Sequence, residues 1–199
     1  MYPEPYIEVT TDLVKTFNFP SALICQLNNC TSRKLHIYSF SWNLAQEYTY
    51  ANPYQHRLIG PYPNLAAEGF RSQLGSVEIL RPPLGREGPS FACLYAQYKM
   101  GKWDSKYYLP CSKTDGNYKY MAIYKDKYED RLLYFQECLN RLLLTLYSND
   151  NYECVIFPKY IGCGMAQGNW EDYEPMISEF CRKLKVRKPR IDVYIVRRC

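Results

Sequence analysis

A glycine-rich loop between an apolar run and an amphipathic segment is the feature of this sequence that most constrains its fold. Residues 154–157 read Cys-Val-Ile-Phe, Pro158 follows them, and residues 162–168 contain three glycines. Apolar residues then recur every three or four positions, at Trp170, Tyr173, Ile177, Phe180 and Leu184. The pattern predicts a buried strand, a loop and a helix. This order brings backbone N–H groups together beside a helix N-terminus, where they can bind a phosphate.

Strand and helix patterns alternate along the rest of the chain. Strands are expected at residues 7–10, 21–26, 76–80, 91–98, 154–157 and 191–196, and helices at residues 39–48, 132–146 and 170–184. Ser39 can cap the first helix. Residues 99–117 are expected to form an irregular insertion. Such alternation predicts an α/β fold with a mixed, mostly parallel sheet and helices on both faces. Ligands of such folds bind beyond the carboxyl ends of the strands.

Composition limits the class of protein. The chain has 199 residues, 47% of them hydrophobic and 23% charged, as expected of one soluble domain. Its net charge of +5 favours anionic partners, and nucleic acid is a less favoured one that stays open. Nine cysteines form no Cys-x-x-Cys pair, and the first residues lack the segments of a signal peptide. We therefore expect an intracellular protein, cytoplasmic or nuclear, with no membrane partner, no metal and no cofactor.

The glycine loop and its flanks resemble the phosphate loop of macrodomains, which bind ADP-ribose and in some members hydrolyse its conjugates. Many members read Ile-Gly-Cys-Gly-Leu-Ala-Gly-Gly-Asp-Trp, where this chain reads Ile-Gly-Cys-Gly-Met-Ala-Gln-Gly-Asn-Trp at residues 161–170. The resemblance implies a three-layer α/β/α fold over residues 1–199 as a single macro-like domain. It also implies that the loop binds the diphosphate, through Gly162, Cys163, Gly164, Met165, Ala166, Gln167, Gly168 and Asn169.

The N-terminal third is similar to the opening of a macrodomain, at residues 10–13 and 21–30. By that match Asp12 accepts a hydrogen bond from the adenine amino group, and Asn28 contacts the distal ribose. Both residues have simpler interpretations, Asp12 as a turn residue at a strand end and Asn28 as part of an Asx turn. Residues 30–57 further resemble a divergent branch of the superfamily that carries a Thr-x-x-x-x-His-Gly-x-Ser segment, with His36 in the histidine position.

Two departures from the macrodomain pattern affect the expected chemistry. Ile37 stands where the branch has a glycine that lets backbone approach the distal ribose. Asn169 stands where the loop has an aspartate, so it can orient a ligand but cannot take a proton. Asn28 and Asn169 are the candidate catalytic residues. His36 is more often a loop histidine than a catalyst, and Cys163 lacks a neighbouring histidine that would make it a nucleophile.

Three hypotheses follow, and they differ in function. The first is an ADP-ribose-binding macrodomain with weak hydrolase activity on ADP-ribosylated protein or ADP-ribose 1″-phosphate. The second is a non-catalytic reader or sequestering module for an ADP-ribose-derived nucleotide or modified protein. The third is a degenerate macro fold used for protein or nucleic-acid interaction, which Ile37 favours. The sequence leaves open whether the protein is an enzyme.

Overall fold

A six-stranded sheet forms the centre of the protein in the computed structural model, which describes residues 5–104, 107–114, 117–123 and 126–197. Its order is β1-β8-β7-β2-β4-β3. The strands are β1 (Ile7–Thr10), β2 (Ala22–Asn29), β3 (Val77–Leu80), β4 (Ser90–Gln97), β7 (Cys154–Pro158) and β8 (Asp192–Arg197). All neighbours pair in parallel except β3, which lies antiparallel to β4 at one edge. The expected mixed, mostly parallel sheet is confirmed.

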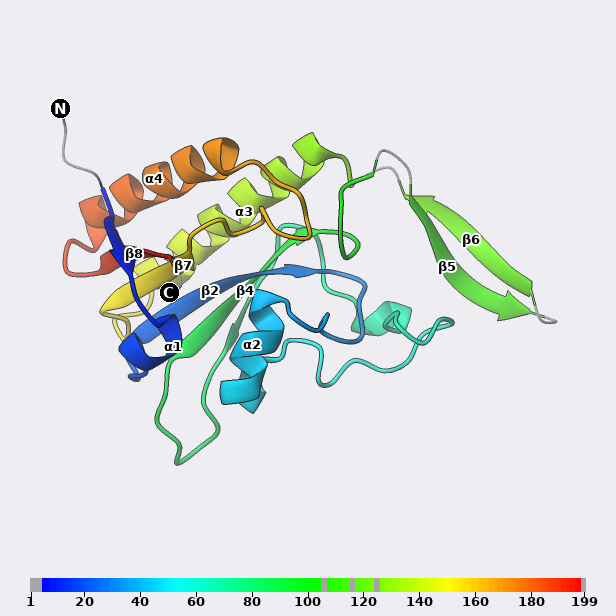
Figure 1. The fold of residues 1–199 in the computed structure, drawn as a ribbon, viewed down its shortest axis with the longest axis horizontal. Coiled ribbons are helices and arrows are strands. Elements are labelled where there is room, and N and C mark those ends of the chain that lie inside the picture. Colours follow the sequence, from blue (N-terminus) through cyan, green and yellow to red (C-terminus); the bar gives the residue numbers. More distant parts are fainter. Residues whose placement is uncertain (1–4, 105–106, 115–116, 124–125, 198–199) are drawn as a thin grey trace.

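Helices cover both faces of the sheet (Figure 1). The long helices α3 (Tyr128–Tyr147) and α4 (Trp170–Arg187) lie on one face, and the short α1 (Leu13–Thr16) and α2 (Phe40–Glu47) lie on the other. Two single-turn 3₁₀ helices, η1 (Thr49–Ala51) and η2 (Glu68–Phe70), follow α2. The protein is thus a three-layer α/β/α structure. None of the helices in the described ranges has the length and hydropathy that crossing a bilayer requires.

Alternation along each interior strand divides the apolar side chains between two cores. On β2, Leu23 and Cys25 pack with α3 and α4, whereas Ala22 and Ile24 pack with α1 and α2. Successive side chains of a strand point to opposite faces, so a continuous apolar run is what a strand covered on both faces needs. All four side chains are fully buried. The sheet is therefore packed on both faces, and this packing fixes the position of the carboxyl ends of its strands.

Two expectations about the strands need correction. Strand β5 (Tyr107–Thr114) pairs antiparallel with β6 (Asn117–Ile123), so the expected irregular insertion at 99–117 was wrong. The two strands project away from the six-stranded sheet in Figure 1 and, among the described residues, form a separate two-stranded sheet. Strand β2 also runs three residues beyond the expected 21–26, because its pairing with β4 continues past a bulge between Asn28 and Asn29.

Candidate functional site

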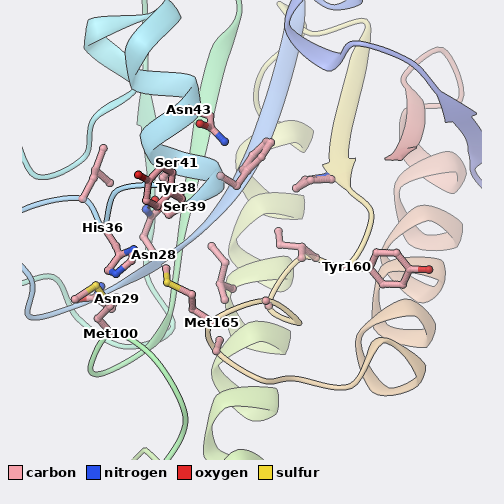
Figure 2. Close-up of a pocket in the computed structure, with 18 of the residues that line it drawn as sticks. Asn28, Asn29, His36, Tyr38, Ser39, Ser41, Asn43, Met100, Tyr160 and Met165 are labelled. Atoms are coloured by element: carbon pink, nitrogen blue, oxygen red, sulfur yellow. The ribbon is translucent and has the colours of Figure 1, made fainter. Parts of the chain in front are cut away.

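A cavity of about 670 Å³ opens at the carboxyl ends of β2, β4, β7 and β8 (Figure 2). Its wall comprises the end of β2, the segment from Leu35 to Asn43 that leads into α2, the loop at Met100 and Gly101, and the glycine loop after β7. This volume lies within the range of pockets that hold small ligands. The cavity therefore lies where the strand–loop–helix order of the sequence predicts a ligand.

Asn28 carries the polar group at the end of β2. Its side chain is 2% exposed, and its Nδ2 donates to the Ser41 hydroxyl at 3.2 Å. Its Oδ1 has no hydrogen-bond partner among the described residues, although buried polar atoms are nearly always paired. Asn28 lines the cavity, so a ligand hydroxyl or amine placed there would satisfy the orphaned oxygen.

Asn29 has a structural role beside Asn28. Its Oδ1 accepts from the Ser32 backbone N–H at 2.7 Å, and its own backbone bonds in both directions with the Tyr54 hydroxyl. Burial raises the pKa of Tyr54 well above its ordinary value, which keeps this hydroxyl protonated and able to donate. Arg57 lies over the Tyr54 ring at 4.3 Å and donates to the Cys30 carbonyl at 2.9 Å. These contacts fix the loop that leaves β2.

The glycine loop combines internal hydrogen bonds with unpaired backbone donors along the cavity wall. Three internal N–H···O bonds close it, from Cys163 to Tyr160, from Gln167 to Gly164 and from Gly168 to Gly162. In the part of the chain that the structure describes, no partner is found for the N–H groups of Gly162, Gly164, Met165 and Ala166. All four residues line the cavity. Adjacent unpaired N–H groups of this kind form a nest that binds anions.

The three glycines of the loop have different structural requirements. At Gly162, φ is 79°, and a Cβ would lie 2.8 Å from the Tyr173 ring. At Gly168, a Cβ would lie 2.6 Å from the Gly162 carbonyl oxygen. Packing against buried Tyr173 therefore demands glycine at both positions. At Gly164, a Cβ would meet no atom within 4 Å, so a side chain there would enter the cavity without disturbing the fold.

A buried ion pair that the sequence analysis did not predict, between Arg131 and Asp126, contacts the glycine loop. Arg131 is 2% exposed, and its guanidinium bonds with Asp126 at 2.7 Å and with Gln97 at 3.1 Å. The same guanidinium donates to the Gly101 carbonyl at 2.7 Å and to the Ala166 carbonyl at 3.5 Å. Arg131 lies on the buried, otherwise apolar face of α3. A charged residue at such a position needs a buried partner, so the sequence did contain a signal for this ion pair.

The opposite end of the cavity from Asn28 carries positive charge. The Tyr160 hydroxyl accepts from Arg197 at 3.2 Å, and its ring packs edge-on against Trp170 with centroids 5.6 Å apart. Lys159 lies beside them and forms an ion pair with Glu8. Figure 2 shows Tyr160 on one side of the cavity and Asn28, Asn29 and His36 on the other. The cations and the loop N–H groups together favour an anionic ligand.

The structure brings only part of the predicted site together. Asn28, Gly162, Gly164, Met165 and Ala166 line the cavity. The remaining predicted residues, which are Asp12, Cys163, Gln167, Gly168 and Asn169, lie outside its wall. Ile37 is 55% exposed and also lies outside the wall.

Asp12 and Asn169 both cap helices. The Asp12 carboxylate accepts from the backbone N–H groups of Val14 and Lys15 at the start of α1, and these bonds hold its pKa below the ordinary value. The backbone N–H of the preceding residue, Thr11, donates to the carbonyl oxygen of Arg197. Asp12 is therefore one residue away from a contact with the cationic end of the cavity. Asn169 accepts from the Glu171 N–H at 3.3 Å and so begins α4.

Cys163 faces the core rather than the cavity. It packs against the cluster beneath α3 and α4, and burial, with a smaller effect of Asp172, raises the pKa of its thiol to about 11. A thiol of this kind is a poor nucleophile at neutral pH. Within the described residues, no three His, Cys, Asp or Glu side chains are grouped as a metal site would require.

The fold is that of a macrodomain. The structure is similar to that of the macrodomain of Mycobacterium tuberculosis DarG, with a TM-score of 0.54 and 17% sequence identity. The similarity covers 94% of this chain and 97% of that chain. No protein-family model matches the sequence, and a comparison with curated proteins gave no match.

Proposed function

We propose that this protein binds ADP-ribose, with the diphosphate on the glycine loop. The observation that carries the proposal is the set of backbone N–H groups at Gly162, Gly164, Met165 and Ala166, which have no partner among the described residues and belong to residues that line one cavity. Backbone donors bind phosphate oxygens without the entropic cost of ordering a long side chain. Arg197 adds positive charge to the same wall, where Lys159 also lies in its ion pair with Glu8.

The two ends of the cavity suit the two ends of this ligand. The distal ribose lies at Asn28, whose buried Oδ1 would accept a bond from a ribose hydroxyl. The adenine would lie toward Tyr160 and Arg197, which line this end of the cavity and bond with each other. Asp12 remains a candidate for the adenine amino group, because Thr11 bonds to the backbone of Arg197. The partner is free ADP-ribose or an ADP-ribosylated protein.

The hypothesis of a degenerate pocket has less support. Its best support was Ile37 in place of the glycine that lets backbone approach the distal ribose, and Ile37 lies outside the cavity wall. Both candidates that retain a pocket, the reader and the weak hydrolase, use the same contacts. They differ in whether a group at the Asn28 end moves a proton.

Isothermal titration with ADP-ribose tests the proposal. We expect a dissociation constant in the micromolar range, which corresponds to about −8 kcal/mol. Adenosine, which lacks the diphosphate, serves as the control and should bind far more weakly. No heat at millimolar ADP-ribose would contradict the proposed function and favour the degenerate fold.

A further inference from the structure

Strands β5 (Tyr107–Thr114) and β6 (Asn117–Ile123), together called the arm here, form a small sheet of their own. Figure 1 shows the arm projecting from the domain, and in the part of the chain that the structure describes its two strands pair only with each other. An isolated ribbon of two strands is marginally stable in water, and stable sheets usually have three or more. The arm therefore has the form of a sheet that lacks a strand.

The base of the arm is fixed to the domain. The Asp104 N–H donates to the Asp126 carbonyl oxygen at 2.9 Å, which joins the segments that lead into and out of the arm. The Asp126 carboxylate is held in turn by its buried ion pair with Arg131. The rings of Trp103 and Tyr128 also contact each other, with centroids 6.2 Å apart. A partner of the arm thus meets an element whose attachment is already ordered, which lowers the entropic cost of binding.

The two strands of the arm differ in their ability to pair with a further strand. β5 contains Pro110, which has no N–H group, and its register with β6 shifts between Pro110 and Ser112. Proline and bulges are features that block the edge of a sheet. The seven residues of β6 include no proline and pair at consecutive register positions. A strand added to β5 would make a strand with a proline the central one, whereas a strand added to β6 would not.

The charge of the arm indicates what kind of strand its edge fits. Residues 102–127 contain six lysines and three aspartates, with no glutamate or arginine, and the two strands themselves contain two lysines and no acidic residue. Two of the aspartates are paired at the base, Asp126 with Arg131 and Asp104 with Lys99. An acidic segment complements this charge, whereas a second copy of the arm would place lysines against lysines.

We propose that the outer edge of β6 binds an extended acidic segment of a partner protein, which adds to the arm as a third strand. Backbone hydrogen bonds along the edge supply the affinity, and the lysines select acidic side chains. A nucleic acid would match the charge, but it has no backbone that continues a β-ladder. Among the described residues that line the cavity, none belongs to β5 or β6, so this proposal does not depend on the proposed function.

Selection from a displayed library of random peptides, each about nine residues long, tests the proposal on the full chain. We expect the enriched peptides to be acidic, and one of them, labelled with fluorescein, then serves as the probe in polarisation titrations. Its affinity should fall about tenfold or more in Lys119→Glu, because the new carboxylate repels the peptide, and should weaken as salt is added. Arg190→Glu is the matched control, because Arg190 is exposed and lies in the turn between α4 and β8, away from the arm (Figure 1).

Methylation of the peptide backbone distinguishes an added strand from a contact between charges. Two versions of the probe carry N-methyl groups on either the odd or the even residues, so each loses alternate N–H donors and keeps its charge. An added strand bonds through alternate residues. One version should therefore bind the wild-type protein like the parent peptide, and the other should lose about tenfold or more in affinity. Equal affinities of the two versions would overturn the proposal.

Three other results would also overturn the proposal. The first is a library that yields no acidic peptides. The second is a wild-type protein that sediments as a dimer and becomes a monomer in Met121→Pro, which would assign the edge to a second copy of the chain. The third is displacement of the probe by single-stranded oligothymidine at lower concentration than by unlabelled peptide, which would assign the arm to nucleic acid. Titration with ADP-ribose tests the proposed function separately, and Lys119→Glu should leave that affinity unchanged.

Discussion

The carboxylate of Asp126 lies 2.7 Å from Nη2 of Arg131, and the two side chains are 0% and 2% exposed. Asp126 also accepts from the Tyr98 N–H at 2.9 Å, so its charge is satisfied from two directions. Arg131 in turn reaches the Ala166 carbonyl in the glycine loop. The pair thus connects the start of α3 to the glycine loop that lines the cavity.

Breaking this ion pair from one side should destabilise the protein. Asp126→Asn leaves the Arg131 guanidinium buried without a counter-charge, which typically costs about 3–5 kcal/mol of unfolding free energy. Urea denaturation followed by circular dichroism measures the loss. The double variant Asp126→Asn/Arg131→Met removes both charges and should lose less than the sum of the single variants. Additive losses would mean that the two side chains act independently.

Gly164→Glu should abolish ADP-ribose binding in a folded protein. A Cβ at this position meets no atom within 4 Å, and the added carboxylate would lie at the proposed diphosphate site. Titration calorimetry measures the affinity, and thermal unfolding checks the fold. Gly69→Glu is a matched control, since Gly69 also has open space around its Cβ position and lies in η2, away from the cavity. Unchanged affinity in Gly164→Glu would show that the loop is not the phosphate site.

Asp12→Ala should weaken ADP-ribose binding by about 1–3 kcal/mol and leave ribose-5-phosphate binding unchanged, because only the first ligand has an adenine. Asp12 also caps α1, so the alanine variant removes two functions at once. Asp12→Ser keeps an oxygen that can cap α1, but its shorter side chain would not reach the adenine. Full affinity in Asp12→Ser would assign Asp12 to the helix alone.

Cys163 should react slowly with iodoacetamide at neutral pH. Burial raises the pKa of its thiol to about 11, and only the thiolate reacts. The rate of alkylation should therefore keep rising with pH beyond the range in which a free thiol levels off. Mass spectrometry of the peptide that contains Cys163 measures it, with glutathione as the reference. Cys163→Ser should retain ADP-ribose affinity, and a large loss would place the sulfur in the site.

The main elements of the fold were predictable because their patterns are local. The apolar spacing of residues 132–146 indicates the helix that became α3, and Ser39 caps α2 through a bond to the Trp42 N–H as expected. The hairpin of β5 and β6 was not predictable in this way. Its strands pair only with each other, so neither needs the alternation by which a core-facing strand is found.

The cavity was predictable in location but not in detail. The order of strand, glycine loop and helix places it at the end of β7. Which loop N–H groups stay unpaired depends on three internal bonds, such as that from Gly168 to Gly162, and residue spacing does not encode them. Asn28 and Asn169 looked equivalent as candidate catalytic residues. Only the register of β2 and the start of α4 place Asn28 in the wall and Asn169 outside it.

The two asparagines give the last prediction. Asn28→Ala should weaken ADP-ribose binding by about 1–3 kcal/mol, because it removes the oxygen that would accept a ribose hydroxyl and leaves Ser41 without its donor. Asn169→Asp should leave both affinity and turnover within about twofold of the wild type. Aspartate caps a helix as well as asparagine does, and position 169 lies outside the cavity wall.

The same two variants decide between the accounts of catalysis. If a carboxylate at position 169 served as an acid or base, Asn169→Asp would raise turnover of an ADP-ribosylated peptide by about 10²–10⁴-fold. We expect no such rise, because the side-chain oxygen at 169 is held by the Glu171 N–H at the first turn of α4. Single-turnover assays with a glutamate-linked peptide and with ADP-ribose 1″-phosphate measure the difference. A large gain in Asn169→Asp would indicate that the chemistry occurs at the start of α4 rather than at the β2 end of the cavity.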